Sequence, residues 1–326
     1  MAVYTQIDNP ELYFQVKLYS GNNSTNAITL DGDEDMSPDI VWLRSRGADN
    51  SRIYDTSRST NSLVPNDSRA EQSDGNFSSF NSDGFTVTGT DTGWNGSGVN
   101  YVAWCFKESA TAGVDIVSYT GNASARTISH SLSAVPKMFI TKRRDSAESW
   151  GVYHHTQGAG KFLRLDNTDG SDTSSTLWNN TTPTSSVFSV AVGGMSNTNG
   201  GTYISYLFAE KKGFSRFGKF VGNGSANGPY VHCGFRPAYV MVKSVSTSQG
   251  WVVYDNKRDT HNPEENTFYI NTSEAESDYV GFDFCANGFK HRSTGGSHNA
   301  NGVEFIFLAF AEAPFCNSSG VPCNAR

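Results

Sequence analysis

Carboxylates at alternate positions are the first residues in this sequence whose spacing suggests chemistry. Residues 31–35 read Asp-Gly-Asp-Glu-Asp, and residues 166–172 hold three aspartates among Asn, Thr, Gly and Ser. Calcium loops alternate oxygen ligands in this way, but they also need a glycine at the sharp turn and a bidentate glutamate at the end. After residues 31–35, Met36 and Trp42 stand at those two positions. We therefore predict two solvated acidic turns and no metal site.

Two adjacent histidines, His154 and His155, are the second candidate. Neighbouring side chains on a strand point to opposite faces of the sheet, so we expect these two rings to face apart. No second cluster of ligand residues lies near them in the sequence. We predict neither a metal-binding nor a catalytic role for the pair.

A glycine-rich segment at residues 222–228 is the third candidate, but no Gly-Lys-Ser/Thr ends it and no helical pattern follows. We predict a turn between strands. Nucleophile elbows, HExxH motifs and dinucleotide-binding glycines are missing from the sequence as well. We therefore predict that the protein is not an enzyme and that it has no catalytic residues and no cofactor. A carboxylate pair assembled only by folding, as in glycosidases, stays an open alternative.

Two tryptophans sit among turn residues and are the candidate contacts for a ligand or partner. Trp94 lies in Thr-Gly-Trp-Asn-Gly, and Trp178 opens a neutral polar stretch. A ring exposed on a loop offers a large contact area and loses little entropy on binding. The other interpretation, which we favour, is that each ring folds back and covers the core of its own domain.

Five cysteines form no Cys-x-x-Cys pair. Cys105 and Cys285 lie in apolar runs, where cysteine behaves as a small hydrophobic residue. Cys316 and Cys323 bracket a turn in the C-terminal tail and would bridge in an oxidising medium. We expect free thiols, because the odd number and long gaps do not resemble a disulfide framework.

Composition narrows the class of protein. The 326 residues carry a net charge of −7, and 17% are charged while 13% are aromatic. Low charge and abundant aromatic residues predict a folded chain. The negative charge argues against a nucleic-acid partner. The sequence holds no apolar run long enough to cross a membrane, so we expect no membrane insertion. The N-terminus lacks a secretion-signal pattern.

The elements that must position these residues repeat three times along the chain. A Tyr/Phe-x-Gly-Asn turn, a proline-led strand, an aromatic turn and a closing aromatic strand recur in the same order at intervals of about 100 residues. The turns lie at residues 19–22, 119–122 and 220–223, and the closing strands at 101–106, 203–208 and 305–310. This period exceeds that of solenoid repeats and matches a small β domain.

Within each repeat, short runs rich in Val, Ile, Phe, Tyr and Trp alternate with Gly, Asn, Ser and Asp clusters. This pattern predicts an all-β protein of three tandem homologous antiparallel β-sandwich or jelly-roll-like modules. The closing strands are apolar on both faces, as a central strand between two packed layers would be. Arg44, Lys142 and Lys243 end the proline-led strands, where we expect the chain to reach solvent. Asn9 and Pro10 predict one short N-terminal helix.

The predicted organisation has five parts. An N-terminal docking segment covers residues 1–17 and a C-terminal tail covers residues 316–326. The three modules cover residues 18–112, 113–213 and 214–315.

These landmarks resemble a repeat family in virion structural proteins of marine tailed phages, especially cyanophages and pelagiphages. The resemblance covers nearly the whole chain, and the second copy departs most, because it lacks the Ser-Asp-Gly-Phe turn and the Trp-Cys pair. The segments that carry it are residues 7–19, 38–44, 54–55, 82–85, 101–106, 310–315 and 324–326.

The resemblance implies a tail, tail-fibre or decoration protein and no known reaction. We expect a tail fibre or tail-attached adhesin, exposed on the virion and assembled in the host cytoplasm. It would bind other virion proteins through residues near its N-terminus, bind a host-surface glycan or protein, and form a homo-oligomer. Deletion of residues 1–18 should then leave a folded protein that is not incorporated. A glycan-binding or glycan-degrading (depolymerase) protein and a capsid decoration or head-fibre protein are the alternatives.

Overall fold

The computed structural model describes residues 4–323. Strands make up 43% of the residues and helices 3%, and the strands pair in antiparallel sheets. The predicted all-β class is therefore confirmed. The Asn-Ala-Arg ending at residues 324–326, which carries part of the resemblance, lies outside the described residues.

The first third of the chain forms two sheets, with strand orders β1-β7-β3-β4 and β2-β6-β5. The 3-10 helix η1 (Pro10–Leu12) precedes them, and the side chain of Asn9 caps it by accepting from the backbone N–H of Glu11. The predicted short N-terminal helix is thus confirmed as a single 3-10 turn. The strands are β1 (Phe14–Ser20), β2 (Asn26–Ile28), β3 (Ile40–Ser45), β4 (Arg52–Asp55), β5 (Phe77–Asn81), β6 (Gly84–Val87) and β7 (Asn100–Phe106).

The second third has a six-stranded sheet, β13-β12-β11-β10-β15-β8, and a two-stranded sheet, β14-β9. Its elements are β8 (Val114–Thr120), β9 (Arg126–Ser129), β10 (Pro136–Arg143), β11 (Gly151–His154), β12 (Lys161–Arg164), β13 (Asp172–Thr173), β14 (Val187–Val190), α1 (Gly194–Asn197) and β15 (Thr202–Ala209).

The last third forms one eight-stranded sheet in the order β16-β23-β18-β19-β20-β21-β22-β17. Its elements are β16 (Ser215–Val221), β17 (Tyr230–His232), β18 (Phe235–Ser244), β19 (Val252–Asp255), β20 (Glu264–Tyr269), β21 (Ser277–Cys285), β22 (Gly288–His291), α2 (Gly296–Asn299) and β23 (Glu304–Pro314).

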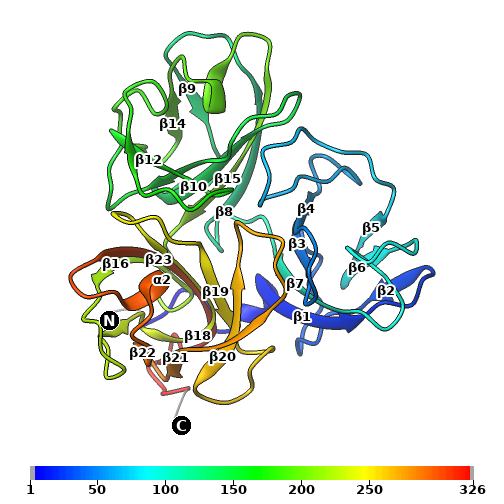
Figure 1. Ribbon diagram of the computed structural model, residues 1–326, viewed down its shortest axis with the longest axis vertical. Helices are drawn as coiled ribbons and strands as arrows, with labels where there is room; N and C mark the ends of the chain where they lie inside the picture. Colours follow the sequence, from blue (N-terminus) through cyan, green and yellow to red (C-terminus); the bar gives the residue numbers. More distant parts are fainter. Residues whose placement is uncertain (1–3, 324–326) are drawn as a thin grey trace.

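One order of four strands occurs in each third. An opening strand pairs with the closing strand, the closing strand pairs with the proline-led strand, and that strand pairs with the next. Figure 1 shows the thirds as three lobes arranged around a common centre. We call them the first lobe (β1–β7), the second lobe (β8–β15) and the third lobe (β16–β23).

Closing strands bury both faces, and the structure shows why. In β7, Tyr101, Ala103 and Cys105 belong to the core between the two sheets of the first lobe. Val102 and Trp104 alternate with them and belong to a second core, which contains residues of all three lobes. The prediction of central strands packed on two sides is therefore confirmed.

The shared core centres on three phenylalanines at matching positions of the closing strands. Phe106, Phe208 and Phe310 are all buried, and their ring centroids lie between 5.2 and 6.1 Å apart. Burial of such rings contributes about 2–3 kcal/mol each from the hydrophobic effect. Because each ring comes from a different lobe, this burial holds the lobes together.

The repeated Gly-Asn turns owe their sequence to close packing. A Cβ atom on Gly121 would lie 2.1 Å from the carbonyl oxygen of Thr198, so no larger residue fits. The buried Asn197 holds the turn, because its Oδ1 accepts from the N–H of Asn122 at 2.9 Å and its Nδ2 donates to the carbonyl of Ser124 at 2.7 Å. Asn95 and Asn299 make the same contacts in the other lobes, which accounts for the predicted turn at residues 222–228.

One expectation about position is wrong. Arg44, Lys142 and Lys243 do not reach solvent, because all three side chains are buried. In the described part of the predicted docking segment, residues 1–17, Ile7 and Phe14 are buried in the shared core, and β1 runs across the predicted boundary. A deletion of residues 1–18 removes part of this core, so we expect it to unfold the protein.

Candidate functional site

The two tryptophans proposed as contacts lie inside the protein. Trp94 is 4% exposed, its indole N–H donates to the hydroxyl of Tyr54, and the guanidinium of Arg52 lies 4.5 Å from its ring centroid. Trp178 is 1% exposed and meets the ring of Phe139 at 4.8 Å. Both rings cover the core of their own lobe, so neither presents a face to a ligand.

The acidic side chains at residues 31–35 are exposed, as predicted, whereas Asp166 in the second turn is part-buried and accepts from the N–H of Trp150 at 3.2 Å. Asp31 pairs with Lys17, and Asp172 pairs with Arg164 at 2.5 Å. Within residues 4–323, no group of three or more His, Cys, Asp and Glu side chains is arranged to hold a metal ion. The cysteines are free, including Cys316 and Cys323.

The main concentration of buried charge lies between the lobes and was not singled out from the sequence. In the first lobe, Asp55 at the end of β4 and Arg58 one turn later are both fully buried. The guanidinium Nε donates to the carboxylate at 2.7 Å, and the remaining nitrogens donate to the carbonyls of Ile53 and Asn61 at 3.0 Å. These hydrogen bonds satisfy both charges, as burial requires.

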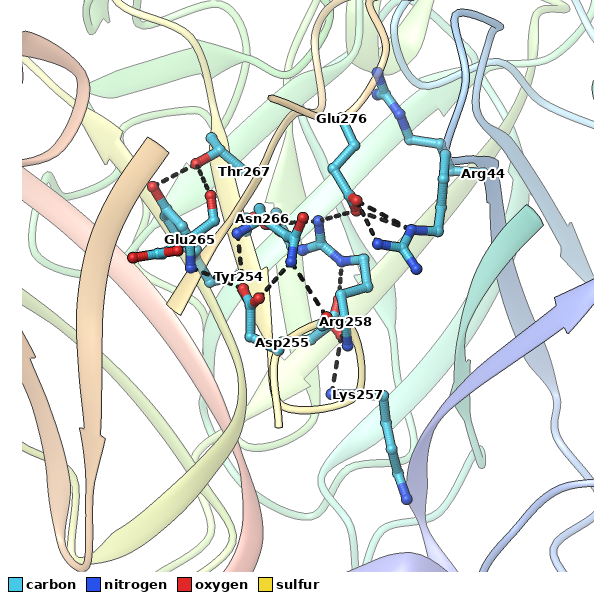
Figure 2. A network of polar contacts seen from close by, with 12 residues as sticks. Arg44, Tyr254, Asp255, Lys257, Arg258, Glu265, Asn266, Thr267 and Glu276 are labelled. Carbon is cyan, nitrogen blue, oxygen red and sulfur yellow. Dashed lines mark hydrogen bonds and ion pairs between the residues drawn. The ribbon is translucent and has the colours of Figure 1, made fainter. Parts of the chain in front are cut away.

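The third lobe repeats this pair. Arg258 Nε donates to Asp255 at 2.6 Å (Figure 2). The other guanidinium nitrogens donate to the carbonyls of Val253 and Asn266. The repeated Asp-x-x-Arg spacing after each tyrosine is the sequence signal that would have identified both pairs.

Each aspartate also accepts a hydrogen bond from another lobe. The hydroxyl of Tyr206 in β15 donates to Asp55 at 2.6 Å, and the indole N–H of Trp104 in β7 donates to Asp255 at 3.0 Å. Tyr206 and Trp104 occupy matching positions in their closing strands. The second lobe thus contacts the first, and the first contacts the third, through the same geometry.

A glutamate extends each pair to a second arginine. Glu71 binds Arg144 of the second lobe at 2.7 Å and lies 3.5 Å from Arg58. Glu276 likewise lies 3.0 Å from Arg258 (Figure 2). It also accepts from Arg46 of the first lobe at 3.0 Å. Both bridges are part-buried, so solvent screens them less than a surface pair.

The buried cations at the ends of the proline-led strands complete the contacts between lobes. Arg44 reaches the third lobe, Lys142 the first and Lys243 the second, and each donates to backbone carbonyls. The acceptors are Tyr269 and Glu274 for Arg44, Ser68 and Glu148 for Lys142, and Thr168 and Gln249 for Lys243. Burial lowers the pKa of Arg44 to about 10 and the pKa of each lysine to about 8.

The contact between the second and third lobes departs from this pattern. His154 stands where the other lobes have aspartate, and Gln157 stands where they have arginine. Gln157 donates to Glu304 of the third lobe at 2.9 Å. The two histidines do not face apart, because β11 ends at His154 and the ring of His155 turns to lie 5.1 Å from it. Burial lowers the pKa of His154 to about 3, so the ring is neutral at pH 7.

One buried carboxyl remains without a partner. Glu264 at the start of β20 is fully buried, and neither of its carboxyl oxygens accepts or donates a hydrogen bond within the described residues. Burial and the nearby Asp259 and Asp255 raise its pKa to about 9. Glu264 is therefore protonated and neutral at pH 7.

The hydrogen bonds between the lobes have a structural role. The carboxylates of Asp55 and Asp255 are buried and accept from the arginines and from a neighbouring lobe. These hydrogen bonds fix the lobes relative to one another.

The fold and this network define an all-β protein of β-sandwich character whose lobes are joined by a common apolar core, by hydrogen bonds to buried charged side chains and by part-buried ion pairs. The chain belongs to the family described as "Domain of unknown function (DUF7483)", whose model matches residues 9–314. Comparison with curated proteins and comparison with solved structures gave no match. No helix within residues 4–323 has the length and apolar character needed to cross a membrane.

Proposed function

We propose that this protein is a non-enzymatic structural component of a tailed-phage virion, built from three homologous β modules and acting as a tail fibre or tail-attached adhesin. The observation that carries this proposal is that the buried charges join one lobe to another. Such a network makes a rigid body, which suits a load-bearing or adhesive part of a particle. The phage assignment rests on the resemblance of the landmarks at residues 38–44 and 101–106.

The three-module organisation is supported by the recurring strand order and by where the connections fall. β7 ends at Phe106 and β8 begins at Val114, while β15 ends at Ala209 and β16 begins at Ser215. Both connections contain a proposed boundary, at 112/113 and 213/214. The first module should start at Phe14, because β1 begins there.

Labelling of virions tests the proposal. Particles of a phage that encodes this chain would be purified, analysed by mass spectrometry and labelled with a gold-conjugated antibody. Label on the tail is the expected result. Label on the head would replace the tail assignment with the decoration alternative, and absence of the chain from purified particles would refute both.

We place the contact with a virion neighbour where the two terminal segments meet. Ser318 donates to the carboxylate of Asp8 at 2.6 Å, and Tyr4 and Val321 are exposed on this side of the chain. Charged substitutions at exposed apolar positions disturb an interface without emptying the core. The variant with Tyr4→Asp and Val321→Asp should fold normally and be lost from virions, and normal incorporation would contradict this placement.

Glycan binding is the second candidate, and one groove of the third lobe favours it. Asp278, Tyr279 and Arg292 line an open groove of about 410 Å³, together with Ser293 and Thr294. The Tyr279 ring is exposed, and its hydroxyl accepts from Ser293 at 3.1 Å. An aromatic face beside charged and hydroxyl groups is a suitable surface for a sugar.

Incubation with host lipopolysaccharide separates the glycan functions. New reducing ends would identify an enzyme, and retention without cleavage would identify a lectin. Tyr279→Ala should abolish retention, whereas Tyr230→Ala, which removes an exposed ring that does not line this groove, should not. If neither cleavage nor retention occurs, the structural role alone remains.

A further inference from the structure

The core of the third lobe contains two histidines at positions where the other two lobes have other residue types. β22 ends at His291, whereas the matching strands β6 and β14 end at Val87 and Val190. All three positions are buried. A basic ring thus replaces an aliphatic side chain in one lobe of three.

The second histidine lies in α2. His298 precedes the turn-holding Asn299, at the position that Trp94 and Ser196 occupy in the other lobes. His298 and His291 are both fully buried. The third lobe therefore encloses two titratable rings that the other lobes do not have at these positions.

Aromatic rings surround the pair. Phe220 of β16 lies 4.3 Å from the ring of His291. Phe282 of β21 lies 4.7 Å from His291 and 5.7 Å from His298, between centroids. Neither ring nitrogen of His291 has a hydrogen-bond partner within the described residues, and the backbone at Val280 is a polar neighbour of the His298 ring. An added proton would have no solvent to stabilise it.

Among the charged groups on the surrounding elements, Lys290 disfavours protonation of His291. Burial has the largest effect in lowering the pKa of His291, and the charges of His298 and of Lys290 on β22 lower it further. β18, which packs against α2, carries the buried Lys243. β19 and β21 contribute the phenols of Tyr254 and Tyr279.

The carboxylate of Asp283, also on β21, is paired with Arg292 at 3.2 Å. Its charge is therefore already matched by an arginine. Burial lowers the pKa of His298 to about 4 and that of His291 well below its ordinary value. Both rings are therefore neutral at pH 7.

We propose that His291 and His298 form an acid-sensitive switch that opens the outer part of the third lobe, β21, β22 and α2, as the pH falls. Protonation requires the rings to reach water, which they do only when these elements separate. The His298 ring packs against Tyr279 at 5.5 Å, so opening also disrupts the groove that Tyr279 lines. The switch is independent of the virion assignment, since it follows from the core of one lobe.

The sign of the effect follows from the direction of the pKa shifts. The closed state binds fewer protons than the open state, so its stability is complete above about pH 6.5 and is lost between about pH 6.5 and 4. We take an ordinary histidine pKa of 6.5 for the open state. Between pH 7 and pH 5 the equilibrium constant for opening then increases by about 20-fold for each histidine and by about 400-fold for the pair.

Hydrogen exchange of the full chain at pH 7 and pH 5 tests the switch. After correction for the intrinsic exchange rate, protection of peptides covering residues 277–299 should fall by about 400-fold at pH 5 in the wild type. His291→Val, which installs the residue of the other two lobes, should reduce the change to about 20-fold, and His298→Ser should do the same. His232→Ala removes an exposed histidine of the same lobe and should leave the full response.

Two results would overturn the proposal. One is equal corrected protection of residues 277–299 in the wild type at both pH values, which does not depend on any variant folding. The other is a full acid response in a folded His291→Val protein. If the virion proposal fails and the switch is found, the two conclusions remain distinguishable, because exchange is measured on the isolated chain.

Discussion

Glu264 should lower the stability of this protein at neutral pH, and its replacement by glutamine should raise it. The carboxyl group is fully buried and its oxygens have no hydrogen-bond partner within the described residues. Burial, with the charges of Asp259 and Asp255, raises its pKa from 4.5 to about 9. The folded state therefore holds a proton at pH 7 that the unfolded chain releases.

The free-energy difference follows from these two pKa values. The pKa of Glu264 is higher in the folded state than in the unfolded chain, so the contribution of this carboxyl to folding stability is complete below pH 4.5. This contribution is lost as the pH rises to about 9. At about 1.4 kcal/mol for each pH unit above 4.5, the ionisable side chain costs about 3 kcal/mol at pH 7. Glu264→Gln has nearly the same shape and does not ionise, so it should recover this amount.

Urea unfolding followed by tryptophan fluorescence measures the gain. The variant should be about 3 kcal/mol more stable than the wild type at pH 7, more so at pH 9, and equally stable at pH 4.5. Glu265→Gln is the matched control, because this neighbour is partly exposed, and it should change stability by less than about 0.5 kcal/mol. Equal stability of Glu264→Gln and wild type at pH 7, or the same gain at pH 4.5, would refute the reasoning.

Three further substitutions test the network, the shared core and the separate core of the second lobe. Arg58→Leu leaves the carboxylate of Asp55 buried without its ion-pair partner and should lower the free energy of unfolding by about 3–5 kcal/mol, whereas Arg69→Leu, at a solvent-exposed ion pair, should lower it by less than about 1 kcal/mol. Phe310→Ala removes a ring from the centre of the three lobes and should cost about 3–5 kcal/mol, with faster hydrogen exchange in every lobe; faster exchange in the third lobe alone would contradict a shared core. Trp178→Ala should cost a similar amount in urea unfolding because the ring is buried, and an unchanged unfolding midpoint would contradict its packing role.

The sequence was sufficient for the all-β class, the short N-terminal helix and the strands that pack on both faces. These follow from local patterns: Asn9 and Pro10 favour the start of a helical turn, and uninterrupted apolar runs such as residues 101–106 favour a strand between two layers. The periodicity of apolar residues indicates which side chains avoid water, but it does not indicate which part of the protein covers them. Local pattern did not reveal that Trp94 is covered by Arg52, which lies 42 positions away in the sequence.

Whether a charged residue is buried or exposed could not be predicted from local sequence patterns. Arg44, Lys142 and Lys243 end strands, and a charge at a strand end ordinarily meets solvent. Here each cation meets carbonyl groups of a neighbouring lobe, and only the arrangement of the lobes brings those carbonyls into reach.

By itself, the sequence determined which segments become strands and which side chains need to be buried, because these depend on the properties of neighbouring residues. Only folding places three lobes around one core, brings Asp55 to Tyr206 across 151 positions, and leaves the carboxyl of Glu264 without a hydrogen-bond partner among the described residues. The physical reason is that the stability of a buried charge depends on the partners that the fold places within hydrogen-bond distance.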